Sequence, residues 1–209
     1  MAGTALLMID MQTGYTVDDG VRDALGWPPI WRLDTVIAEC AELLTAARLA
    51  RIPVIYSKQM GSPAGSLAMN PRAVRHMQSR QSRVPVLSAA QQEYRREIIE
   101  AVAPTPEDLI LEKTRHSFFA YTELDPVLRS LAIQRLIVAG LQTNVCVEAT
   151  VRAALERNYD VALAEDAVST DGPDLPADAP WDRAFTTPNY GRNPNYWNEL
   201  LDAPSPRTP

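Results

Sequence analysis

Short apolar runs alternate along the chain with longer stretches in which apolar residues recur every three or four positions. The run at 4–10, TALLMID, is short and almost entirely apolar, which is typical of a buried strand, whereas residues 32–50 repeat apolar positions at helical spacing. The same criteria predict strands at 51–57, 107–112, 135–140 and 160–165, and helices at 122–131 and 145–157. Apolar strands that alternate with helices indicate a parallel sheet covered on both faces. We therefore expect an α/β fold.

Two segments do not follow this alternation of strands and helices. Residues 58–92 contain no acidic residue but five basic ones, namely Lys58, Arg72, Arg75, Arg80 and Arg83. They either recognise a substrate carboxylate at the ligand-binding edge of the sheet or meet an acidic surface of a neighbouring subunit. The segment 171–209 holds 8 of the 17 prolines, which predicts an irregular C-terminal arm. Because we find no repeat and no low-complexity linker, we expect a single domain over 1–209.

Net charge and cysteine content indicate which partners and which cellular compartment to expect. The 209-residue chain has a net charge of -6, which argues against nucleic acid or an anionic membrane as the main partner. Its two cysteines are too few for a disulfide framework and fit a reducing cytoplasm. The N-terminal residues lack the features of a signal peptide, and no apolar run is long enough to span a membrane. We expect a cytoplasmic protein that acts on a small molecule.

Three reactive side chains follow predicted strands. Asp10 ends the first strand, Lys113 follows the third, and Cys146 comes six residues after the end of the fourth. The carboxyl ends of parallel strands share one edge of a sheet, so an acid, an amine and a thiol are expected to meet there. Thr143 and Asn144 are candidate N-caps, which would put Cys146 in the first helical turn, where the helix dipole and Lys113 favour a thiolate.

Cys40 differs from Cys146, because it lies in the middle of a predicted helix among apolar residues. We expect it to be part of the core.

The segments LLMIDMQTGY, LEKTRHSFFAYTELDPVLR and VAGLQTNVCVEATVRAA together resemble the isochorismatase-like cysteine hydrolase superfamily. The resemblance covers most of the chain and implies a three-layer α/β/α fold with a six-stranded parallel sheet. It also implies a catalytic triad of Asp10, Lys113 and Cys146, and a cis peptide between Leu141 and Gln142. The backbone N–H groups of Gln142 and Cys146 would then form an oxyanion hole.

Within the family, the chain is most similar to ureidoacrylate and biuret amidohydrolases, whose pattern K-P-R-Y-S-x-F-F-x-T-x-L-D aligns without gaps with KTRHSFFAYTELD. This resemblance implies that a thioester mechanism cleaves a C–N bond of a small amide or ureide. The alternatives are a vinyl-ether hydrolase of the isochorismatase type, which needs no thiol, and a non-catalytic binding protein on the same fold.

The resemblance also bears on metals, on the substrate pocket and on assembly. The metal site of nicotinamidases needs a histidine and carboxylate motif that two histidines, His76 and His116, cannot supply, so we expect no metal and no cofactor. Family members commonly form homodimers or homotetramers. The residues expected to line the substrate pocket are Gln12, Tyr15, Phe119 and Gln142.

Overall fold

The computed structural model of the chain describes residues 3–17, 19–60 and 84–171. The strands are β1 Thr4–Ile9, β2 Val54–Gln59, β3 Leu109–Lys113, β4 Arg135–Leu141 and β5 Asp160–Ser169. The helical elements are α1 Thr13–Thr16, α2 Val21–Ala24, α3 Leu33–Leu49, α5 Ala89–Arg96, η1 Glu100–Val102, α6 Leu124–Ser130, η2 Thr143–Val147 and α7 Glu148–Leu155. Each predicted strand and helix therefore has a counterpart in the structure.

The five strands form one parallel sheet in the order β3-β2-β1-β4-β5. The central strand β1 pairs with β2 on one side and with β4 on the other. The expected α/β fold with a parallel sheet is thus confirmed. The sixth strand implied by the family resemblance would fall outside the described residues.

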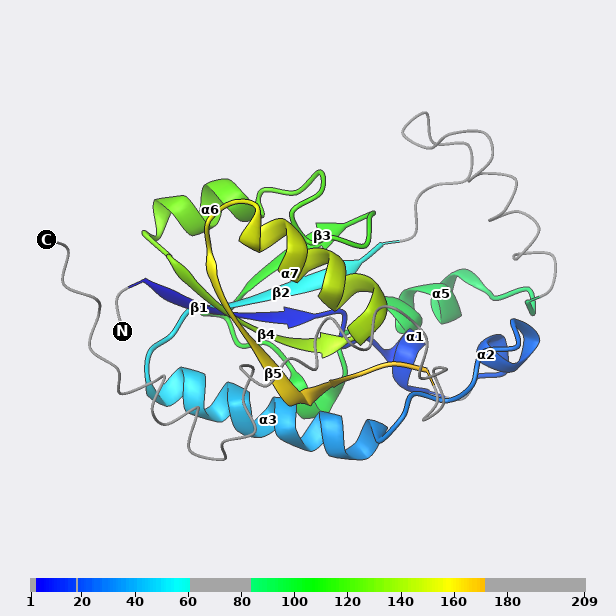
Figure 1. The fold of residues 1–209 in the computed structure, drawn as a ribbon. Helices are drawn as coiled ribbons and strands as arrows, with labels where there is room; N and C mark the ends of the chain where they lie inside the picture. Colours follow the sequence, from blue (N-terminus) through cyan, green and yellow to red (C-terminus); the bar gives the residue numbers. More distant parts are fainter. Residues whose placement is uncertain (1–2, 18, 61–83, 172–209) are drawn as a thin grey trace, which may run out of the picture.

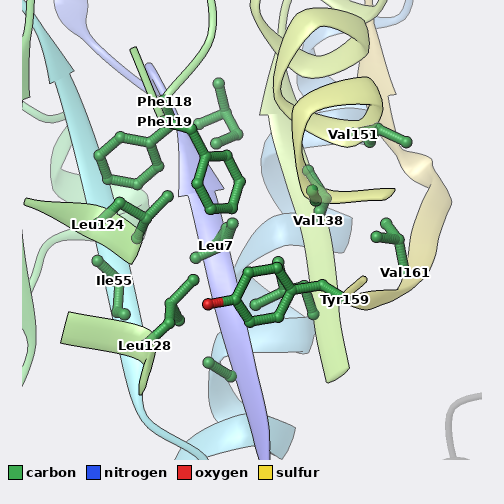
Figure 2. Close-up of a cluster of buried hydrophobic side chains, with 14 of the residues drawn as sticks. Leu7, Ile55, Phe118, Phe119, Leu124, Leu128, Val138, Val151, Tyr159 and Val161 are labelled. Carbon is green, nitrogen blue, oxygen red and sulfur yellow. The ribbon is translucent and has the colours of Figure 1, made fainter. Parts of the chain in front are cut away.

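Helices cover both faces of the sheet (Figure 1). Alternate residues of a strand point to opposite faces, and in β1 Leu6 and Met8 pack in one core cluster with α3. Leu7 and Ile9 pack in the other cluster, with α6 and α7. Figure 2 shows part of this second cluster around Phe118, Phe119 and Tyr159. Because both faces are covered, β1 is apolar at every position from Ala5 to Ile9.

Cys40 lies in α3 and is completely buried. Its thiol donates a hydrogen bond to the carbonyl oxygen of Ala167 at 3.3 Å. The prediction that Cys40 belongs to the core is confirmed.

Two predicted elements differ from the structure. Strand β3 lies at an edge of the sheet. Its Leu109 and Ile110 are partly exposed, although the apolar run 107–112 was predicted to be a buried strand. The predicted helix at 145–157 is preceded by a π-helical turn, η2, and its α-helical part begins only at Glu148.

Helix α5 was not predicted, because all its residues are at least partly exposed and it has no apolar face. It begins with a capping box in which Ser88 and Gln91 bond to each other's backbone, which is a local signal of a helix start. Across the described residues, no helix is both long and apolar enough to cross a membrane.

Candidate active site

Asp10, Lys113 and Cys146 meet at the edge of the sheet where the parallel strands end. The Nζ atom of Lys113 lies 2.7 Å from Oδ2 of Asp10 and 3.4 Å from Sγ of Cys146. Asp10 follows β1, Lys113 is the last residue of β3, and Cys146 lies in η2 after β4. The sheet therefore brings together three side chains that are far apart in the sequence.

Side chains of β2, the strand between β1 and β3, hold this group in place. Ser57 donates a hydrogen bond from Oγ to Oδ1 of Asp10 at 2.5 Å and accepts one from the Asp10 backbone N–H at 3.0 Å. Gln59 accepts a hydrogen bond from Nζ of Lys113 at 2.6 Å, and the carbonyl of Arg115 accepts another at 3.1 Å. The ammonium is therefore fixed between the carboxylate and the thiol.

Burial dominates the electrostatics of the site. Asp10 and Lys113 are each 1% exposed, and Cys146 is 7% exposed. Burial raises the pKa of Asp10, although the Lys113 ammonium opposes this shift. Burial and the negative charge of Asp10 raise the pKa of the Cys146 thiol to about 12, and Lys113 lowers it only in part. Cys146 at neutral pH is therefore a thiol.

This result corrects the prediction that the first turn of a helix favours a thiolate at Cys146. The N-cap position is held by Gln142, not by Thr143 or Asn144, and no side chain caps this end. Cys146 lies within the π-helical turn and so precedes α7. Burial and the Asp10 charge are the causes that raise the pKa of this thiol.

The turn between β4 and η2 has a cis peptide between Leu141 and Gln142. The carbonyl of Gln142 accepts hydrogen bonds from the N–H groups of Val145 and Val147, both at 3.1 Å. The Gln142 side chain donates from Nε2 to Oδ1 of Asp171, which also pairs with the buried guanidinium of Arg22. Gln142 is thereby held in one orientation beside the nucleophile.

The residues predicted to line the pocket have different surroundings. Tyr15 is partly buried, and its pKa is raised by burial and by the nearby negative charge of Asp10. Phe119 packs in the core cluster with its ring 5.8 Å from that of Tyr159, which favours a core role over a pocket role (Figure 2).

The side chain of Gln12 is bound by the protein's own backbone. Its side-chain amide donates to the carbonyls of Gln59 and Arg96 and accepts from the Gln59 N–H. These bonds tie the ends of β1, β2 and α5 together, so Gln12 braces the site and its amide is already engaged within the protein.

The position of His116 beside the nucleophile was not predicted from the sequence, where this residue was considered only as a metal ligand. The imidazole Nδ1 lies 3.9 Å from Sγ of Cys146. The KTRHS segment places His116 three residues after Lys113, and this spacing was the available signal. Ser57 and Gln59 were also missed, because the sequence does not show which side chain a polar residue at a strand end will contact.

The four arginines of the basic segment and most of the proline-rich arm lie outside the described residues. Lys58 does lie within them, and its Nζ is 3.9 Å from the Glu93 carboxylate. No group of three or more His, Cys, Asp or Glu side chains spaced for a metal ion occurs in the part of the chain that the structure describes.

Comparison with known proteins gives the family. The Isochorismatase domain family matches residues 4–190. The chain belongs to this family. It is 33% identical to the ureidoacrylate amidohydrolase RutB of Pantoea ananatis over 180 residues, which cover 82% of this chain and 71% of that protein. The RutB protein of Caulobacter vibrioides is 34% identical over 181 residues, which cover 82% of this chain and 79% of that protein.

A solved structure of the family also matches the fold. The crystal structure of a cysteine hydrolase from Pseudomonas syringae pv. phaseolicola superposes with a TM-score of 0.66 at 29% identity, covering 83% of this chain and 76% of that one. The parallel sheet described above is therefore of the isochorismatase type.

Proposed function

We propose that the protein is a cysteine amidohydrolase that cleaves a C–N bond of a small amide or ureide through a thioester. The observation that carries this proposal is the position of the Lys113 ammonium, 2.7 Å from the Asp10 carboxylate and 3.4 Å from the Cys146 sulfur. A buried acid and a buried thiol joined by one cation form a nucleophile with its own base. The names of the RutB relatives, which are ureidoacrylate amidohydrolases, support a ureide or a related amide as substrate.

Acylation begins when Asp10 takes the proton of Cys146. The raised pKa of Asp10 makes this carboxylate a stronger base than an exposed one, and the thiolate formed has a high pKa and is strongly nucleophilic. Lys113 contacts both atoms, so its positive charge stays beside the negative charge before and after the proton moves.

The thiolate then attacks the substrate carbonyl carbon. The backbone N–H groups of Gln142 and Cys146 are the proposed donors to the oxyanion, because they belong to the turn that holds the nucleophile. Asp10 returns the proton to the leaving nitrogen, the C–N bond breaks, and the acyl group remains on Cys146. Asp10, again a carboxylate, then takes a proton from water as the water oxygen attacks the acyl carbon. The carbon–sulfur bond breaks, the acid is released, and the proton returns to Cys146.

The test is a screen for ammonia release over ureides, carbamoyl amino acids and simple amides. The best substrate is then assayed with Cys146→Ser, which should lose activity by at least about 10²-fold, because a serine hydroxyl is a far weaker nucleophile near neutral pH. Cys40→Ala is the matched control, since this thiol is remote in the core, and it should retain turnover.

Three results would contradict the proposal. Cys146→Ser that keeps a large part of the activity would exclude the thioester mechanism. Cleavage of a vinyl ether by the wild-type protein, with no ammonia released from any amide or ureide, would indicate the isochorismatase reaction instead. A protein that binds ligands but turns over none would be a binding protein on this fold.

A further inference from the structure

A second set of polar side chains, separate from Asp10 and Lys113, is attached to the nucleophile turn at Gln142. Gln142 donates a hydrogen bond from Nε2 to Oδ1 of Asp171, and the same oxygen accepts another from Nη2 of Arg22. Arg22 is only 9% exposed and is itself a donor to the carbonyl oxygen of a neighbouring backbone group. The buried guanidinium thus holds the Asp171 carboxylate, and the carboxylate holds the Gln142 amide.

Backbone contacts on both sides keep Asp171 at this position. Asp171 forms an antiparallel bridge with Ile30, and the Thr170 carbonyl accepts a hydrogen bond from the Trp31 N–H at 2.8 Å. The Thr170 hydroxyl donates to Oδ1 of Asn144 in the nucleophile turn. The segment after β5 is therefore fixed both to the segment before α3 and to the turn that holds the nucleophile.

The contact with Asp171 decides which end of the Gln142 amide is free. A carboxylate paired with an arginine is only an acceptor, so the NH₂ group of the amide must face Asp171 and the oxygen must face away from it. Within residues 3–17, 19–60 and 84–171, no group donates a hydrogen bond to Oε1 of Gln142, and this residue is half-buried. The turn that holds Cys146 therefore also holds an oriented acceptor with no internal donor.

This acceptor belongs to the surroundings of the catalytic group. Gln142 follows β4 directly and lies four residues before Cys146, and its carbonyl accepts two backbone N–H groups of the turn. Burial and the charge of Asp10 raise the pKa of Tyr15, whereas Arg22 opposes the shift. One phenol thus senses both the catalytic carboxylate and the guanidinium that holds Asp171.

We propose that Gln142 is a specificity-determining residue whose Oε1 accepts a hydrogen bond from an N–H on the acyl group of the substrate, and that Asp171 and Arg22 are positioning residues that orient it. This inference rests on the proposed thioester chemistry. The carbonyl carbon of a ureide bears two nitrogens. One leaves with a proton as ammonia or an amine, and the other stays on the carbamoyl thioester. A simple amide has carbon at that second position, so the site favours ureides over simple amides.

The experiment compares two acyl donors, 4-nitrophenyl carbamate and 4-nitrophenyl acetate. Both acylate a thiol and release 4-nitrophenol, but the carbamate has NH₂ where the acetate has CH₃. The ratio of the two acylation rates at pH 7, each corrected for the rate without protein, reports the added N–H because the reactivity of Cys146 is common to both. The variants are Gln142→Met, which removes the acceptor at similar volume, and Asp171→Asn. Gln134→Met, at an exposed residue just before β4, is the matched control.

We expect the carbamate-to-acetate ratio to fall by about tenfold in Gln142→Met, the usual worth of one hydrogen bond. Asp171→Asn should lower the ratio by about threefold or more, because an asparagine amide can also donate to Oε1 and so lets the Gln142 amide turn over. Gln134→Met should keep the wild-type ratio. A purely structural role of Gln142 would lower both rates by the same factor and leave the ratio unchanged.

The possible failures are distinguishable. An unchanged ratio in Gln142→Met, whether or not both rates fall, would overturn the specificity role of Gln142 alone. A ratio that falls in Gln142→Met but not in Asp171→Asn would overturn the positioning role of Asp171. Wild-type protein that mass spectrometry never finds acylated at Cys146 by either donor would overturn the proposed thioester mechanism, and the inference with it.

Discussion

At the scale of single residues, Asp10 has two opposite effects on Cys146. Its negative charge raises the thiol pKa, and its carboxylate is also the proposed acceptor of the thiol proton. Lys113 acts in the other direction and lowers the pKa of the thiol. Replacing Asp10 by a neutral isostere leaves the ammonium without a carboxylate and so favours the thiolate.

Asp10→Asn is therefore expected to separate thiol reactivity from catalysis. Turnover should fall by about 10²–10⁴-fold, because the general base is lost. Alkylation of Cys146 by iodoacetamide near pH 8 should become at least about tenfold faster, since removal of a like charge lowers a pKa by one unit or more. Both rates are measured on the same preparation, with the label located by mass spectrometry.

Asp166→Asn is the matched control, because this carboxylate lies exposed on β5, and it should change neither rate. Slower alkylation of Cys146 in Asp10→Asn would show that the Asp10 charge does not raise the thiol pKa.

At the scale of elements, the close pairing of β1 and β4 depends on Gly140. This residue has a φ of 111°, where side chains are strongly disfavoured, and it pairs with Ile9. A Cβ atom at Gly140 would lie 2.1 Å from the Ile9 carbonyl oxygen. The glycine therefore lets the strands that carry Asp10 and the nucleophile turn approach each other.

Gly140→Ala should lower the free energy of unfolding by at least about 3 kcal/mol, the sum of a strained backbone and a steric clash. Urea unfolding followed by circular dichroism measures this change. Gly26→Ala separates the two causes, because Gly26 also has a positive φ, of 68°, but a Cβ there would meet nothing within 4 Å. It should cost only about 1–2 kcal/mol. Equal losses in the two variants would contradict the close approach.

At the scale of the whole molecule, the core contains buried groups that become charged only at high pH. Burial raises the pKa values of Cys40 and Cys146 from an ordinary 9 to about 12, and burial and Asp125 raise that of Tyr159 to about 12. A raised pKa in the folded state means that the folded protein holds these protons more tightly than the unfolded chain does. Their contribution to stability is complete below about pH 9 and is lost as the pH rises toward 12.

The free energy of unfolding should therefore fall by about 2–4 kcal/mol between pH 8.5 and pH 10.5, if two thiols titrate in the unfolded chain. Urea unfolding at several pH values measures this slope. Cys40→Ala should be less stable at every pH but should lose stability less steeply, because one proton no longer takes part. A flat profile in wild type over this range would contradict the buried, neutral thiols.

The sequence by itself determined the α/β class, the five described strands and the motif residues Asp10, Lys113 and Cys146. These follow from local patterns: apolar runs report which segments are buried on both faces, and a strand end places its residue at the ligand edge. The core position of Cys40 followed from helical spacing in the same way.

Only the tertiary structure decided the state and the partners of these groups. The thiol pKa depends on desolvation by distant segments and on a carboxylate 136 positions away, so a helix-start argument predicted the wrong direction. The bracing of Lys113 by Gln59 and the contact of His116 with Cys146 join residues on different elements. The surroundings of Gln12 and Phe119 could not be predicted either, because a motif position does not reveal whether a side chain faces the pocket, the core or a neighbouring strand.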